Sequence, residues 1–550
     1  MKHQQQTFIR PFLTAVFLTV ALCAGAADYY FNNPGKAGYF EGAGNWFIGN
    51  QPAGNYPGEG DVIRTTNGMQ KVTFQTPGAT NRVSDILLNL QKDNQRLTFD
   101  FSGGELYVTN GVQLTASRYE TSNQPYVVVT NGTLRVGNGL SVGNGTNYRA
   151  EFLACGKGTD VIVEKGNFSS QGTTATATIL DGATVLIKSG YLLASSKIGY
   201  GQGLMTLSGT DTRIVSSNGF RVTENTLVTI ANKAKVEIHG YSAAGMWGRQ
   251  NRNSIGIDDG GLGGTGNARV EIDDAEMSVD AAYFFVAESD RHRLYGHELT
   301  VKNNGKFLFT GDSQLVCAYI QNGADGSTPS YATNNAVRVY SGGKIDSAGN
   351  TCNSEWNDVG SIVIGLGSPF YSGDNGVHVS NGVINVNHIT LGGIDSASNN
   401  WLRIEGPASK LTLTQPYAAA GNRAGNRRRA AALGISNNAR VEFVIGKDGF
   451  DAPPIQLTTS CGYVDGVQGA GQKAQIIVFD DGFARANRAK TIALIQTLST
   501  SSQSVFATLI ADAVVHADKE WNKGKLSVSA DGKSLLYTTP ALKGTMVLVQ

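Results

Sequence analysis

Residues 377–411 read VHVSNGVINVNHITLGGIDSASNNWLRIEGPASKL, and the pattern in this stretch occurs three times in the chain. Two apolar residues at alternate positions precede a glycine, and a second glycine follows. An apolar-x-apolar-x-Gly unit comes next, with one more apolar residue five places beyond its glycine. The three copies are Val127, Val129, Gly132, Gly143, Phe152, Ala154, Gly156, Val161; Val185, Ile187, Gly190, Gly199, Met205, Leu207, Gly209, Ile214; and Val377, Val379, Gly382, Gly392, Leu402, Ile404, Gly406, Leu411. Such repetition predicts a solenoid, in which each unit buries its apolar face against its neighbours.

The repeated units have the pattern of β-strands. Apolar residues alternate with polar ones and the runs end at Asn or Gly, as at Asn131-Gly132 and Asn381-Gly382. Alternation with period two places one side of each strand inward. Asn-Gly pairs also permit antiparallel hairpins. We favour an all-β, parallel β-helix, expected to be right-handed, because groups of three strands recur along the chain, and local hairpins would not require that.

The composition excludes several classes of protein. Of 550 residues 69 are Gly, charged residues are 16% and the formal net charge is +1. This balance gives no electrostatic basis for binding nucleic acid or an anionic membrane. The many Val, Ile, Leu and Thr residues argue against disorder. The chain is therefore expected to be rich in strands and tight turns.

The first 27 residues have the pattern of an export signal. Lys2 and Arg10 are followed by an apolar stretch at 12–22 and by the small residues Ala24-Gly25-Ala26. Eleven apolar residues are too few to span a bilayer, which needs about 20. Cys23 leaves a lipid-anchored N-terminus as an alternative, which we do not favour because Leu22 stands where a small residue is wanted. We expect cleavage near Ala27 and no transmembrane segment in the mature chain.

The mature chain divides into three parts. Residues 28–69 are rich in turns and aromatics and predict an N-terminal cap, with a sugar-binding platform around Trp46 as the alternative. Residues 70–440 form the expected β-helix, in which 417–433 are interpreted as a loop carrying Arg427, Arg428 and Arg429. Longer apolar strands at 441–550 predict a small C-terminal β module, including a hairpin around Asp531-Gly532.

The chain resembles the passenger-type β-helix repeat regions of bacterial autotransporter-like surface proteins, found in Gram-negative and planctomycete-type bacteria. The resemblance rests on Gly-Asn-Trp…Pro-Gly…Gly-Asp-Val at 44–62, the Val-x-Asn-Gly units, LRIEGPASKLTL at 402–413 and the hairpin at 526–537. It covers most of the mature chain and implies a right-handed β-helix on or outside the cell. The C-terminal translocator barrel of that family is not expected here, because the strands after residue 440 are too few.

The sequence predicts no catalytic, cofactor or metal site. Asp258-Asp259, Asp273-Asp274 and Asp480-Asp481 are adjacent pairs, and neighbours on a strand face opposite ways. The densest polar cluster, at 290–298, contains His292, His297, Arg291, Arg293 and Tyr295 and is interpreted as a solvated loop or an acid/base site. We expect His378 to face outward between two inward valines, whereas the facing of His388 stays open.

Four cysteines remain after the signal: Cys155, Cys317, Cys352 and Cys461. An exported protein meets oxidising conditions, and stacked coils would permit a Cys317–Cys352 disulfide. Unpaired thiols that act as small apolar residues are the interpretation we favour.

Two functions follow from different classes of protein. The first is an exported, non-enzymatic scaffold, adhesin-like or structural, that contacts glycans, other cell-surface components or copies of itself. It would act at the outer surface, in the medium or in the periplasm. The second is a carbohydrate-active β-helix enzyme, a polysaccharide lyase or glycosidase, with a site in loops near 240–300. Such enzymes need carboxylates or basic groups gathered on one face. We expect the scaffold because no such set is visible in the sequence.

Overall fold

The computed structural model describes residues 27–541 except 33–36, 65–68, 91–95, 117–125, 144–149, 173–174, 196–201, 224, 241–253, 258–265, 282, 290–292, 311–313, 321–330, 348–359, 368–370, 392–396, 399, 415–429, 451–452, 458–460, 466–473 and 498–502. Residues 1–26 of the predicted export signal (1–27), Asp258-Asp259, Arg291, His292, Cys352 and the arginines at 427–429 lie outside the described residues.

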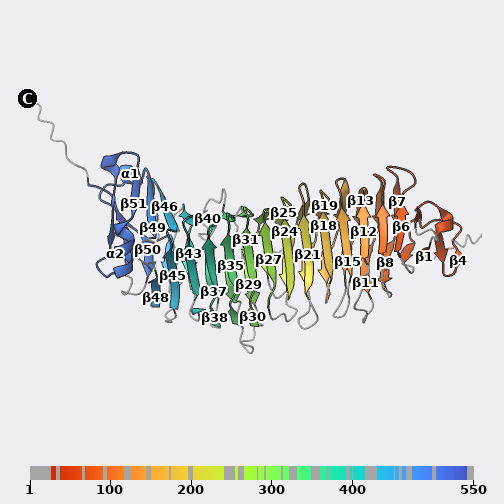
Figure 1. Ribbon diagram of the computed structural model, residues 1–550, viewed down its shortest axis with the longest axis horizontal. Helices are drawn as coiled ribbons and strands as arrows, with labels where there is room; N and C mark the ends of the chain where they lie inside the picture. The colour runs from red at the N-terminus through yellow and green to blue at the C-terminus, as the bar shows by residue number, and fades with distance from the viewer. Residues whose placement is uncertain are drawn as a thin grey trace, which may run out of the picture.

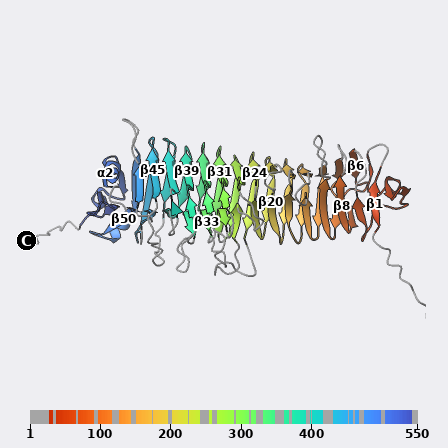
Figure 2. The same ribbon diagram turned by 90° about the horizontal axis from the view of Figure 1, so that it is seen from below.

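The described chain is a long rod of parallel β-strands, as predicted (Figure 1). Three sheets run along the rod, and each full coil contributes one strand to sheet B, then one to sheet C, then one to sheet A. Each strand pairs in parallel with its counterpart in the next coil, so the strands stack like rungs along the long axis in both views (Figure 2). This is the architecture of a parallel β-helix.

Sheet B is the face that carries the candidate site. Its strands, in order, are β2 (Ala37–Tyr39), β6 (Met69–Thr73), β9 (Arg96–Asp100), β12 (Tyr126–Thr130), β15 (Glu151–Cys155), β18 (Thr176–Leu180), β21 (Gly203–Ser208), β24 (Thr226–Ala231), β27 (Arg269–Asp273), β31 (Glu298–Lys302), β35 (Ala336–Tyr340), β39 (Gly376–Ser380), β43 (Asn400–Glu405), β45 (Ala430–Ser436) and β48 (Cys461–Asp465). Residues 430–433, which the sequence placed in a loop, thus begin strand β45.

Sheet C follows sheet B across a tight corner. Its strands are β7 (Thr80–Val83), β10 (Glu105–Val108), β13 (Gly132–Val136), β16 (Thr159–Val163), β19 (Thr184–Ile187), β22 (Arg213–Ser216), β25 (Lys235–His239), β28 (Glu276–Asp280), β32 (Lys306–Phe309), β36 (Lys344–Asp346), β40 (Val383–Val386), β44 (Lys410–Leu413), β46 (Arg440–Gly446), β49 (Gln475–Asp481) and β51 (Val514–Ala517).

Sheet A completes each coil, and a short sheet E widens four of them. The parallel strands of sheet A are β1 (Asp28–Phe31), β5 (Val62–Arg64), β8 (Asp85–Leu90), β11 (Gly111–Ala116), β14 (Gly139–Val142), β17 (Phe168–Gln171), β20 (Tyr191–Ser195), β23 (Gly219–Thr223), β26 (Ser254–Ile257), β29 (Tyr283–Ser289), β33 (Gln314–Ile320), β37 (Ile362–Gly367), β41 (Ile389–Leu391), β47 (Ile455–Leu457) and β50 (Thr491–Thr497). Sheet E holds β30 (Arg293–Tyr295), β34 (Tyr331–Thr333), β38 (Tyr371–Gly373) and β42 (Ala397–Ser398).

The core is a set of apolar ladders that run along the rod. In sheet B, Val129 pairs with Ala154, which pairs with Ile179, and each is fully buried. The ladder continues through Leu207 and Ile230 in the same register. Burying a Val, Ile or Leu side chain contributes about 1.5–3 kcal/mol. The stack is therefore held by many equivalent layers.

The three sequence copies do not all begin at the same place in the coil. The first apolar pair lies in sheet B in the copies that start at Val127 and Val377, but Val185 and Ile187 lie in β19 of sheet C. The pattern is shared because any inward-facing strand that ends in a tight corner requires alternation followed by a small residue. The second half of the pattern lies on a sheet B strand and the next sheet C strand in every copy.

Tight corners depend on residues that tolerate unusual backbone or close contact. Asn131 and Asn381 occupy the left-handed region between sheets B and C, with φ of 55° and 56°. A Cβ on Gly190 would lie 1.6 Å from the backbone oxygen of Gly166 in the preceding coil. The Asn-Gly pairs are therefore corners of a coil, and the antiparallel hairpin alternative does not apply to them.

A polar ladder of buried asparagines runs inside the rod beside sheet E. The Asn375 side-chain oxygen accepts hydrogen bonds from the backbone N–H and the side-chain amide of Asn335, at 3.1 and 2.9 Å. Asn400 accepts from Asn375 in the same way. His297 takes the next rung: its N–H donates to Asn335 and its Nδ1 accepts from Ala268. The ladder satisfies backbone donors that would otherwise be buried unpaired.

The N-terminal end of the rod is closed by aromatic side chains. Trp46, in the antiparallel strand β3 (Trp46–Ile48), is fully buried and packs edge-on against Phe31 and Phe40, with centroids 5.1 and 5.3 Å away. Its Nε1 donates to the Phe40 carbonyl at 2.7 Å. Because the ring is buried, Trp46 does not form an exposed sugar platform. The segment also contains β4 (Gln51–Pro52) and a 3-10 turn, η1 (Ala43–Asn45).

The parallel stacks continue beyond residue 440, through β46 and β49. The boundary predicted at 440 therefore does not coincide with their end. The expected hairpin is present: β52 (Lys525–Val528) and β53 (Ser534–Thr538) are antiparallel around Gly532, which has φ of 71°. Strand β53 also pairs antiparallel with β50. Helices α1 (Phe483–Ala486) and α2 (Gln503–Ala511) and the turn η4 (Glu520–Asn522) complete this end.

Candidate functional site

The outer face of sheet B changes character along the rod. In one row of outward residues, the side chains from Val128 to Thr229 carry no charge. From Glu271 to Arg403 the row is polar and most of its members are ionisable. In order along the rod this row is Val128, Leu153, Thr178, Thr206, Thr229, Glu271, Thr300, Arg338, His378 and Arg403. Neighbouring strands are about 4.8 Å apart, so the charged members lie side by side. We call Glu298, Arg338, Tyr340, His378, Trp401, Arg403 and Glu405 the sheet B cluster.

One half of the cluster is centred on Arg338. Its Nε donates to Glu298 on the preceding strand at 2.9 Å, and its Nη1 donates to the Tyr340 hydroxyl at 3.0 Å. Burial lowers the pKa of Arg338, but the hydrogen bonds to Tyr340 and Glu298 outweigh burial and raise it. Arg338 is therefore a permanent cation whose position is fixed by two partners.

The other half is centred on His378, which faces outward as predicted. Its Nδ1 lies 3.3 Å from the Tyr340 hydroxyl, and its Nε2 lies 2.8 Å from Glu405 Oε1. Both ring nitrogens thus have partners, and a continuous chain of contacts runs from Glu298 to Glu405 across four coils. Such a chain orients each polar group before any ligand arrives.

Trp401 adds an aromatic surface beside these polar groups. Its ring lies against the backbone of the preceding strand, β39, since a Cβ on Gly376 would lie only 2.1 Å from the ring. The His378 ring meets it edge-on at 6.5 Å, and the Arg403 guanidinium lies 5.1 Å from its centroid. Trp401 is half-buried.

A second charged group lies next to the cluster, toward the N-terminus. Lys302 Nζ binds Glu271 at 2.9 Å and lies 3.7 Å from Asp273. Hydrogen bonding to Glu271 raises the pKa of Lys302 against the opposing effect of burial. These three side chains form one ion-paired group with an excess of one carboxylate, and they extend the polar surface by one coil.

The cluster combines two carboxylates, two guanidinium groups, a phenol, an indole and an imidazole. The charges of Arg338 and Glu298 neutralise each other, and Glu405 Oε1 lies within hydrogen-bonding distance of His378 Nε2. Among the residues the structure describes, no group of three or more His, Cys, Asp or Glu side chains has the arrangement of a metal site.

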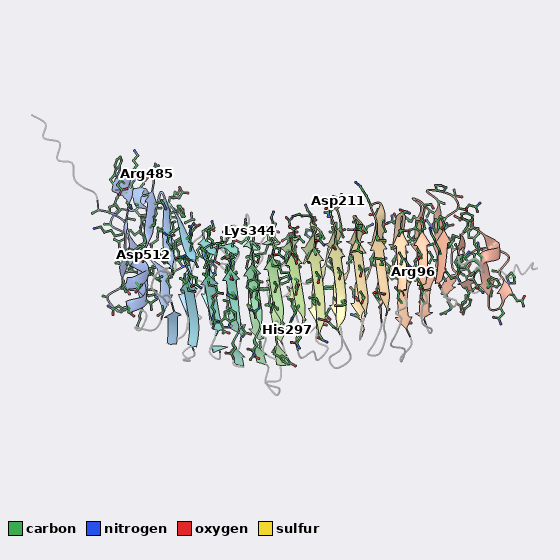
Figure 3. The ribbon with its side chains drawn as sticks, viewed as in Figure 1. Arg96, Asp211, His297, Lys344, Arg485 and Asp512 are labelled. Carbon is green, nitrogen blue, oxygen red and sulfur yellow. The ribbon has the colours of Figure 1, made fainter. Side chains whose placement is uncertain are left out.

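The polar cluster predicted at 290–298 does not converge on one site. Tyr295 is exposed in strand β30, and His297 is buried as part of the asparagine ladder near the middle of the rod (Figure 3). Burial lowers the pKa of His297 to about 4. Glu298 faces outward and belongs to the sheet B cluster. Alternation along the strand thus separates His297 from Glu298.

The other candidates have structural positions. Asp273 accepts from Asn303 at 2.8 Å at a corner, and Asp274 pairs with Lys233. His388 is buried, and burial lowers its pKa to about 3. Asp480 is buried at the C-terminal end of the rod, where it accepts from the Ala484 N–H.

The described cysteines behave as small residues. Cys317 is a free thiol on the inward side of sheet A, between Val286 and Ile364, and burial raises its pKa to about 12. Cys155 is also free. These positions agree with the interpretation of unpaired thiols.

Sequence reasoning missed Arg338, Tyr340, Trp401, Arg403 and Glu405 as members of a site. The alternation in the sequence shows that each of them faces outward. It does not show which strands are neighbours, because the length of a coil varies. In sheet B it ranges from 23 residues between Met205 and Val228 to 42 between Val228 and Val270.

In the part of the chain that the structure describes, no helix has the length and apolar character needed to cross a bilayer. Comparison of the chain with protein-family models, curated proteins and solved structures found no match. The assignment of a function therefore rests on the rod and on the sheet B cluster.

Proposed function

We propose that this chain is an exported, non-enzymatic β-solenoid scaffold, adhesin-like or structural, that presents the outer face of sheet B at the cell surface or outside the cell. The observation that carries the proposal is the unbroken register of sheets B and C from β7 to β48. A stack in which every coil buries its apolar face against two neighbours extends without needing a larger core. Such a rod holds a contact surface at a fixed distance from its ends.

The polar groups of the sheet B cluster are paired with one another, which supports a contact surface and not a catalytic one. The ion pair Arg338–Glu298 and the hydrogen-bonded pair His378–Glu405 already provide partners for these polar groups on the open face of a sheet. The export pattern at 1–27 and the resemblance to autotransporter-like passengers support a location outside the cytoplasm. Glycans are the partners we expect, because a half-buried Trp beside planar polar groups suits a sugar ring.

Surface labelling of intact producing cells tests this proposal. An antibody against the rod should label intact cells or detect the protein in the medium, and protease added outside should digest the cell-bound form. The recovered chain should begin near Ala27 or Asp28 by mass spectrometry. Recovery of the full 550-residue chain only from the cytoplasm would contradict the proposal.

One observation favours a second candidate, a carbohydrate-active enzyme. The chain Tyr340–His378–Glu405 places an imidazole between a hydroxyl and a carboxylate, with Arg338 alongside. A base oriented by a carboxylate is an element of general acid–base catalysis. This set lies outside 240–300, where the sequence placed the alternative site.

Incubating the purified protein with neutral and acidic polysaccharides separates the two candidates. The scaffold proposal expects no new reducing or unsaturated ends. New ends that disappear in a His378→Ala variant, and persist in the outward control Asn385→Ala on sheet C, would establish the enzyme instead.

A further inference from the structure

Arg403 differs from Arg338, the other arginine of the sheet B cluster, and from His378. Arg338 is held by Glu298, and His378 is held by Glu405. Arg403 is exposed, and among the described residues it has no carboxylate partner; its contact is with the ring of Trp401. A guanidinium presents a rigid fork of donors that matches carboxylate and sulfate oxygens. The cluster therefore presents one cation whose hydrogen-bonding capacity is open to a ligand.

The ring of Trp401 beside this cation is fixed in place. Gly376 leaves room for the ring to lie against strand β39, and a methyl group there would overlap it. The edge of His378 and the guanidinium of Arg403 contact the same ring. An aromatic side chain that is already ordered loses little conformational entropy when a ligand packs on it.

The hydrogen-bond acceptors on this face narrow the choice of ligand. Glu298 and Glu405 lie on the same face, and together with Tyr340 they can accept hydrogen bonds from hydroxyl groups. A ligand with many hydroxyls and one anionic group per ring suits this arrangement.

We propose that Trp401 and Arg403 form a binding site for an anionic saccharide, with the apolar C–H face of the sugar on Trp401 and its carboxylate or sulfate on Arg403. This inference rests on the proposed function, since it names the ligand class of the contact surface. The neighbouring Glu405 and Tyr340 accept from the sugar hydroxyls. The site lies on the open face of sheet B, and successive sugars extend along that face from coil to coil.

Calorimetric titration of the mature chain tests the site. The probes are oligogalacturonate, a sulfated oligogalactoside and a neutral oligogalactoside of the same length, with polyglutamate as an acidic peptide. We expect one or both anionic sugars to bind at least tenfold more tightly than the neutral one, and polyglutamate to bind no better than the neutral sugar. The two anionic arms distinguish a carboxylate from a sulfate as the recognised group.

Three variants locate the binding. Arg403→Gln should reduce the affinity for the anionic sugar about tenfold or more and leave the neutral sugar unchanged. Gly376→Ala, which displaces the Trp401 ring, should weaken both sugars. Arg440→Gln, an exposed arginine on sheet C, should change neither. A thermal unfolding curve for each variant confirms that the rod is intact.

Equal affinity for anionic and neutral sugars, tighter binding of polyglutamate, or an Arg440→Gln effect as large as that of Arg403→Gln would overturn the site. Binding accompanied by cleavage would support the site and overturn the non-enzymatic scaffold. Absence of binding by a rod that is found on the cell surface would overturn the site alone.

Discussion

The Tyr537 hydroxyl donates a 2.6 Å hydrogen bond to Asp480, which lies 57 residues earlier in the chain. Asp480 lies near the end of the sheet C strand β49 and also accepts from the Ala484 N–H at the start of α1. Tyr537 lies in β53, the antiparallel strand that covers β50. Burial and the Asp480 carboxylate raise the pKa of Tyr537, which therefore remains a donor at neutral pH. One buried contact thus joins the last coils to the C-terminal hairpin.

Removing this contact should loosen the C-terminal end of the rod and nothing else. Tyr537→Phe leaves the Asp480 carboxylate buried without one of its donors, at a cost of about 1–3 kcal/mol. Hydrogen exchange should become faster in β53 and α1 and stay unchanged in β12–β24, because each coil contacts only its neighbours. The exposed neighbour provides the control: Asp481→Asn should leave exchange unaltered, whereas Asp480→Asn should resemble Tyr537→Phe. Uniformly faster exchange along the rod would contradict this account.

A methyl group at Gly190 should be incompatible with the stacking of two coils. The added Cβ would overlap the Gly166 oxygen at 1.6 Å, and both partners are backbone atoms that cannot turn aside. Gly190→Ala should therefore destabilise the protein by about 3 kcal/mol or more, or prevent folding. Gly446→Ala, where a Cβ meets no atom within 4 Å, is the matched control and should have little effect on the melting temperature. Equal melting temperatures for the two variants would show that these coils are not stacked as described.

Acid should weaken the rod through its buried histidines. The pKa of His297 is lowered to about 4 and that of His388 to about 3, against about 6.5 in an unfolded chain. Between pH 6.5 and 4 the unfolded chain therefore binds protons that the folded chain does not. The free energy of unfolding falls in this window, by up to about 1.4 kcal/mol per pH unit for each histidine.

Replacing His297 tests the origin of this slope. His297→Asn extends the asparagine ladder with a side chain that does not titrate, so the melting temperature should fall less between pH 6.5 and 4.5 than in the parent protein. His378→Asn, on the outer face, is the control and should retain the full slope. The lowered pKa values of Asp85 and Asp100 act mainly below pH 4 and do not mask the effect. An unchanged slope in His297→Asn would contradict the role given to this residue.

The fold could be predicted because it follows from patterns within single strands. The site could not, because it depends on which strands lie side by side. Alternation within one strand predicts that Val377 and Val379 face inward and that His378 faces outward, and each lies as predicted. Partners in the sheet B cluster are 40 residues apart at Glu298 and Arg338 but 27 apart at His378 and Glu405. These separations follow the lengths of the connections between strands, which no period in the sequence reveals.

Residues 290–298 allowed two interpretations, a solvated loop or an acid/base site, and the order of residues did not show which side chains share a face. Successive residues at a strand start point to opposite sides, so His297 and Glu298 do not share one site. His297 is interior and Glu298 is exterior. Trp46 illustrates the same difficulty, since an aromatic residue in a turn-rich segment suits either a platform or a cap until its burial is known.

Distances between spin labels along sheet B test the in-register parallel stack most directly. Thr98 is five strand steps from Thr229 and ten from Arg403 in one outward row. At about 4.8 Å per step the pairs should be about 24 and about 48 Å apart. The background lacks Cys155, Cys352 and Cys461 and retains the buried Cys317, which should not react with the label. Distances near these values, in a ratio of two, are the predicted result; a second distance equal to or shorter than the first would contradict the stacked rod on which the proposed function depends.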